Sequence, residues 1–102
     1  MLLENIPNAL SSAERLVLLL GQTHLKLGFC LDVGHANINE GVEKAFDLMQ
    51  DRIHSTHLHD NDGKSDSHMS PFFSVAATID WKNTLTLLRS QPSQCPLILW
   101  LT

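Results

Sequence analysis

A chain of 102 residues can fold as one small domain with a usable core, and it leaves no room for a second domain. The net charge of −4 leaves no basic surface to neutralise a phosphate backbone, which disfavours nucleic acid as a partner. The longest aliphatic run, at 16–20, is too short to cross a membrane, and no secretory signal follows Met1, so we expect a cytoplasmic protein.

The first third of the chain contains two apolar runs separated by a helical pattern. Residues 1–4 resemble the end of a buried strand, and residues 27–32 predict a strand that is buried on both faces. Between them, Ser11 and Glu14 have the spacing of a capping box, and apolar residues follow at helical intervals. This pattern predicts a helix that ends near Gly21.

The rest of the chain continues the alternation. Its patterns predict a helix, a strand, a helix and a strand, in that order, at 40–50, 53–59, 81–90 and 96–100. We expect Asn39 and Asp80 to cap the two helices. Short apolar strands joined by helices predict an α/β fold with four parallel strands, three intervening helices and right-handed crossovers.

Four of the six histidines and three aspartates lie in one segment, residues 54–68. The segment begins as a strand and then breaks at the turn signal 61–63. Imidazoles beside carboxylates at a strand end suit Zn²⁺, Mn²⁺ or Co²⁺, and the alternative is a polar loop with solvated histidines. His54 should face away from His57, toward a helix or solvent. The role of His59 is open between support of a ligand and exposure to solvent.

Acidic residues and histidines end three successive predicted strands. Glu4 ends the first strand, Asp32 ends the second and precedes His35, and His57 lies near the end of the third. Parallel α/β folds, and (β/α)₈ barrels above all, build their sites at the carboxyl edge of the sheet. We therefore expect the side chains of Glu4, Asp32 and His57 to converge. The two cysteines, Cys30 and Cys95, lack CxxC spacing and predict buried, reduced thiols.

Together these segments resemble the sugar phosphate isomerase/epimerase group of the xylose isomerase-like TIM barrel superfamily, which also includes endonuclease IV. The segments that carry the resemblance are ENIPN, LDVGHAN, HLHDNDGKSDSH and IDW, at 4–8, 31–37, 57–68 and 79–81. The resemblance implies a partial (β/α)₈ barrel in which residues 1–102 form the C-terminal segment, strands five to eight. A full barrel needs about 250 residues.

The resemblance also implies a site and a chemistry. It implies a divalent metal, Zn, Mn, Co or Mg, held by Glu4, Asp32 and His57, and a further ion held in multi-metal members by the residues that match His35, Asp66 and His68. The substrate would be a sugar or sugar phosphate whose carbonyl the metal polarises. Glu4 would be a catalytic acid/base that moves the neighbouring proton through an enediolate.

Two departures from the family pattern favour a different function. Trp100 stands where the resemblance implies a glutamate at the end of the last strand, and the first four strands are absent. The alternative is therefore a catalytically inactive remnant or a metal-binding pseudoenzyme. DNA repair of the endonuclease IV type shares the ligand pattern, but the acidic charge argues against it. An open arc exposes two strand edges, so we also expect self-association or pairing with a separate N-terminal half.

Overall fold

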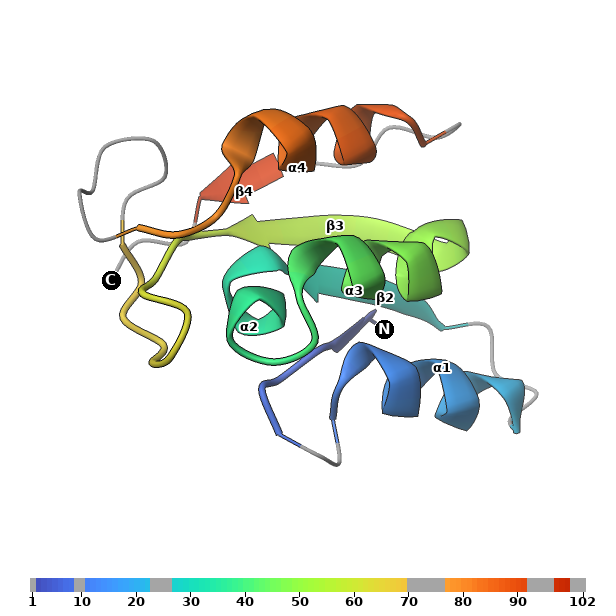
Figure 1. The fold of residues 1–102 in the computed structure, drawn as a ribbon. Helices are drawn as coiled ribbons and strands as arrows, with labels where there is room; N and C mark the ends of the chain where they lie inside the picture. Colours follow the sequence, from blue (N-terminus) through green and yellow to red (C-terminus); the bar gives the residue numbers. More distant parts are fainter. Residues whose placement is uncertain (1, 9–10, 23–26, 70–76, 92–96, 100–102) are drawn as a thin grey trace.

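Four parallel strands form one sheet in the computed structural model, which describes residues 2–8, 11–22, 27–69, 77–91 and 97–99 (Figure 1). The strands keep their sequence order in the sheet: β1 (Leu2–Glu4), β2 (Gly28–Asp32), β3 (Ile53–Leu58) and β4 (Leu97–Leu99). All three neighbouring pairs are parallel. The predicted α/β class with four parallel strands is confirmed. Two residues named above, Cys95 and Trp100, lie outside the described residues.

The strand register brings the carboxyl ends of β1, β2 and β3 to one edge of the sheet. Glu4 pairs with Cys30, and Asp32 pairs with His57 two residues further along. Side chains alternate along a strand, so Cys30 and Asp32 share one face of β2. Phe29, before Cys30, and Leu31, between Cys30 and Asp32, belong to the hydrophobic core on the other face.

Three longer helices cover the sheet, and in Figure 1 they lie along the same side of it. They are α1 (Ala13–Gly21), α3 (Val42–Met49) and α4 (Trp81–Arg89), and α3 contacts both of the others. The cap of α1 is Ser12, whose hydroxyl accepts from the N–H of Arg15, so the capping box predicted at Ser11 is wrong by one residue. Asp80 caps α4 as predicted.

The apolar stripes of these helices form the core against β2 and β3. Leu20 of α1, Phe46 and Met49 of α3 and Leu88 of α4 are all nearly fully buried in one cluster with Leu31. Burying a large apolar side chain contributes about 1.5–3 kcal/mol, so this cluster is what fixes the helices to the sheet. None of the described helices is long and apolar enough to cross a membrane.

The structure contains a helix that the sequence patterns did not predict, α2 (Val33–Ile38), followed later by a 3₁₀ turn (Gln50–Arg52). Four α-helices therefore occur in the described residues, not three. Asn39 ends α2, and Gly41, at φ 96°, precedes α3, so the predicted Asn39 cap is wrong. The signal for α2 was Asp32, whose carboxylate caps it by accepting from the N–H of His35.

Candidate metal centre

The side chains of Glu4, Asp32 and His57 converge at the carboxyl edge of the sheet. The Nδ1 atom of His57 lies 2.7 Å from Oε1 of Glu4 and 3.8 Å from Oδ2 of Asp32. Two carboxylates thus face one imidazole nitrogen, which is the oxygen and nitrogen ligand set of a borderline divalent cation. We call these three residues the first cluster.

Asp32 is held in place by contacts that leave one of its oxygens available. It is 1% exposed, and its Oδ1 accepts from the N–H of His35 at 2.8 Å and from Nε2 of His59 at 2.6 Å. Its backbone N–H and C=O pair with the side-chain amide of Asn5 at 2.7 and 3.0 Å. These contacts fix the carboxylate so that Oδ2 faces His57.

His35 lies between the first cluster and the loop that follows β3. Its Nδ1 lies 2.8 Å from the carbonyl of Asn5, and since a carbonyl only accepts, Nδ1 carries a proton. Its Nε2 lies 3.1 Å from Oδ2 of Asp66. Burial lowers the pKa of His35, but Asp32, the Asn5 carbonyl and Asp66 outweigh burial and raise it above its usual value. The nitrogen of His35 that can bind a metal is therefore Nε2.

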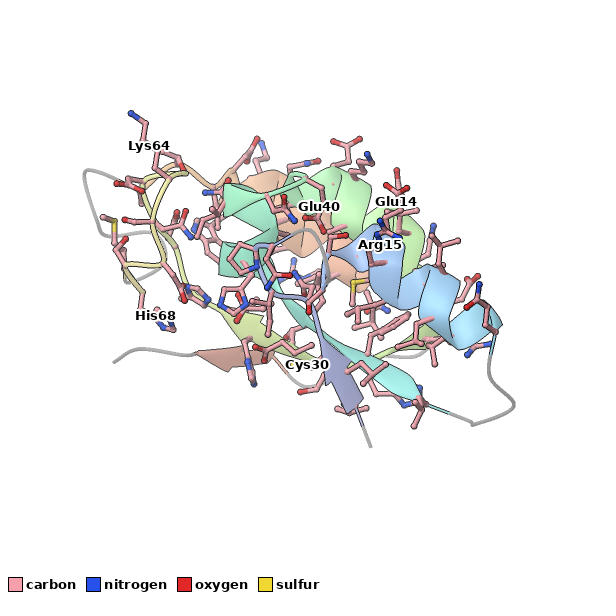
Figure 2. All side chains as sticks on the ribbon, turned by 90° about the horizontal axis from the view of Figure 1, so that it is seen from below. Glu14, Arg15, Cys30, Glu40, Lys64 and His68 are labelled. Carbon is pink, nitrogen blue, oxygen red and sulfur yellow. The ribbon has the colours of Figure 1, made fainter. Side chains whose placement is uncertain are left out.

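His35, Asp66 and His68 form a second cluster, and the loop fold brings its last two members to the sheet. Asp60 and Met69 exchange backbone hydrogen bonds at 2.8 and 2.7 Å, which closes the loop. His68, labelled on this loop in Figure 2, has a left-handed backbone at φ 50° and places Nε2 3.0 Å from Oδ1 of Asp66. Burial raises the pKa of Asp66, but the effects of His68 and His35 are larger and bring this pKa below its usual value, so the carboxylate stays ionised.

The structure also brings in residues whose roles the sequence left open or unseen. Asn5 positions Asp32, and His59 is fully buried against it instead of facing solvent. Asp60 accepts from backbone and Trp81 donors inside the fold. Cys30, labelled in Figure 2, lies with Glu4 and His57, and burial, then Glu4 and Asp32, raises its pKa to about 12. The alternation of β2 places Cys30 on the Asp32 face, which was the available signal.

Gly34 lies between Asp32 and His35, and the ring of His59 occupies the space that a side chain at this position would need. A Cβ atom on Gly34 would lie 2.0–2.5 Å from three atoms of that ring. We expect Gly34→Ala to lower the free energy of unfolding by about 1–3 kcal/mol, because the methyl group forces the buried imidazole away from Asp32. Denaturant unfolding of both chains measures this. An equal change in Gly21→Ala, where a Cβ meets nothing, would contradict it.

A family model described as xylose isomerase-like TIM barrel matches residues 1–100 of the chain. The crystal structure of a D-tagatose 3-epimerase-like protein superposes with a TM-score of 0.75 and 27% sequence identity. The match covers 94% of this chain and 38% of that protein, so the chain spans well under half of its length. No curated protein matches the sequence.

Proposed function

Because the chain belongs to the xylose isomerase-like TIM barrel family, we propose that it is part of a divalent-metal-dependent isomerase or epimerase of a sugar or sugar phosphate. The observation that carries the proposal is the convergence of Glu4, Asp32 and His57, with His57 2.7 Å from one carboxylate and 3.8 Å from the other. The D-tagatose 3-epimerase-like neighbour supports a ketose as the substrate class.

In this proposal the first cluster holds the catalytic ion. The ligand atoms are Oε1 of Glu4, Oδ2 of Asp32 and Nδ1 of His57, and two carboxylates with one imidazole suit Zn²⁺, Mn²⁺, Co²⁺ or Mg²⁺. Two carboxylates beside one imidazole nitrogen make this edge of the sheet attractive to a cation. When bound, a divalent ion would polarise the carbonyl of the sugar and make the adjacent C–H more acidic. The second cluster would hold a further ion.

Glu4 is the residue that would move the proton. Its side chain is 32% exposed, so a substrate can reach it, whereas Asp32 is buried. Its second oxygen, Oε2, lies 3.7 Å from Nδ1 of His35. The carboxylate would take the proton from the carbon beside the carbonyl to give an enediolate, and return of a proton to a different carbon or face would complete the reaction.

We also propose that the chain corresponds to strands five to eight of a barrel and works with the remaining strands, supplied by a separate N-terminal half or a second copy. Within the described sheet, β1 and β4 have a neighbour on one side only. Near the β1 edge, Leu2 and Ile6 are each 43% exposed. Unpaired strand edges favour association with further strands, and the other half of a substrate pocket would come with them.

Metal analysis combined with a sugar assay tests this function. The chain would be assayed for conversion of D-tagatose alone, then with the N-terminal half of the D-tagatose 3-epimerase-like protein, and then with Trp100→Glu as well. We expect the chain alone to bind a divalent ion without turnover. Turnover should require both the N-terminal half, which supplies the other side of the substrate pocket, and Trp100→Glu, which supplies the missing ligand. If the complemented barrel bound no divalent ion, the ligand assignment would be wrong.

The second candidate is a metal-binding protein without catalysis, and the sequence feature that favours it is Trp100. An indole replaces the glutamate that the family resemblance implies as a ligand and acid/base. The same assay separates the two candidates. Bound metal with no turnover in the complemented Trp100→Glu barrel would support the pseudoenzyme, whereas turnover by the unmodified chain would exclude it.

A further inference from the structure

His59 is the most completely enclosed histidine among the described residues, and its two nitrogens have different surroundings. The side chain is fully buried, and Nε2 lies 2.6 Å from Oδ1 of Asp32. A carboxylate oxygen can only accept here, so Nε2 carries the hydrogen. In a neutral imidazole the other nitrogen, Nδ1, then carries a lone pair.

That lone pair has no partner. Nδ1 of His59 is the one buried side-chain nitrogen or oxygen in the described part of the chain that makes no hydrogen bond. The nearest ionic atom, Oδ1 of Asp66, is 3.8 Å away, beyond hydrogen-bonding distance. Buried polar atoms are almost always satisfied, so an unpaired buried acceptor calls for a partner such as a water molecule or an ion.

The side chains around this nitrogen carry further atoms that can bind a metal ion. Each of His35, His59, Asp66 and His68 offers one ligand atom, and these four atoms all lie within 4.8 Å of one another. The rings of His59 and His68 stack with centroids 4.1 Å apart and planes 5° apart, so the two imidazoles lie face to face beside Asp66. Three imidazoles and one carboxylate make a four-ligand set that suits Zn²⁺ or Co²⁺.

We propose that Nδ1 of His59 is the fourth ligand of the divalent-cation site formed with the second cluster. This deepens the proposed function and rests on its second ion. Its other nitrogen donates to Asp32, so one buried ring joins the two clusters: the imidazole ligates on one side and fixes the ligand Asp32 on the other.

Metal titration of a matched pair of variants tests the proposal. After chelator treatment, Zn²⁺ or Co²⁺ is titrated by calorimetry into the full chain and into His59→Gln, whose amide can still donate to Asp32. We expect one of two binding events to weaken by about 10–100-fold in His59→Gln while the other is kept. His54→Gln, which removes an exposed histidine from the strand that precedes His59, should match the unmodified chain. Unchanged binding of both ions by His59→Gln would overturn the proposal.

Nitrogen-15 spectra of the imidazoles give a second readout that needs no variant. In the Zn²⁺-loaded chain we expect Nδ1 of His59 to be metal-bound and Nε2 to be protonated, and a proton on Nδ1 instead would overturn the proposal.

Asp66→Asn distinguishes a wrong assignment of His59 from a wrong assignment of the second ion itself. If Asp66→Asn loses an ion that His59→Gln keeps, the site exists without His59, and if neither loses one, the second ion is wrong.

Discussion

Asp32→Asn is expected to weaken binding of a divalent ion at the first cluster by more than about 100-fold while the chain still folds. The asparagine oxygen can keep both contacts of Oδ1, accepting from the N–H of His35 and from Nε2 of His59. The amide nitrogen takes the place of Oδ2, which faces His57, and it has no lone pair to offer an ion. Calorimetric titration of the chelator-treated chain with Mn²⁺ or Zn²⁺ measures the loss.

Two further variants make the result specific to ligation. Asp47→Asn makes the same chemical change at an exposed position of α3, and it should bind ions as the unmodified chain does. Asp32→Ala should lose the ion and also about 1–3 kcal/mol of stability, because the buried Nε2–H of His59 and the first turn of α2 lose their acceptor. Binding by Asp32→Asn at the affinity of the unmodified chain would show that Asp32 is not a ligand.

Periodicity and strand order were enough to predict how the first cluster assembles. Glu4, Asp32 and His57 each lie at or near the end of a short apolar run, and parallel strands bring such ends to one edge whatever the details of packing. Asp80 was equally predictable, because a cap depends on the few residues that follow it. The assignment of these strands to one half of a barrel depended on the family resemblance.

The contacts that hold the cluster depend on three-dimensional packing and were not predictable. The sequence does not decide between the two roles considered for His59, whereas in the fold β3 ends at Leu58 and His59 turns into the interior against Gly34 and Asp32. Asn5 belongs to the ENIPN segment, but nothing in that segment predicts that its two hydrogen bonds reach a backbone 27 residues away. The missed helix α2 has six residues, too few for an apolar period to show.

Asp60 provides the clearest case of a motif residue that the fold uses for stability. Its carboxylate is fully buried, and Oδ1 accepts the backbone N–H groups of Asn61, Thr78 and Ile79 at 2.7, 3.1 and 3.2 Å. Oδ2 accepts Nε1–H of Trp81 at 2.6 Å. One side chain therefore ties the loop after β3 to the start of α4, and with it the loop that carries Asp66 and His68.

Asp60→Ala is expected to lower the free energy of unfolding by about 3–5 kcal/mol, because it leaves several buried donors without an acceptor. That is a large share of the roughly 5–15 kcal/mol that stabilises a typical domain, so chemical denaturation should show a strongly shifted midpoint.

Asp60→Asn should also lower the free energy of unfolding, since its amide N–H would meet the N–H donor of Trp81. Trp81→Phe removes that donor, so the double variant Asp60→Asn, Trp81→Phe should lose less than the sum of the two single losses. Strict additivity would mean that the indole and the carboxylate contribute independently, contrary to the hydrogen bond between them.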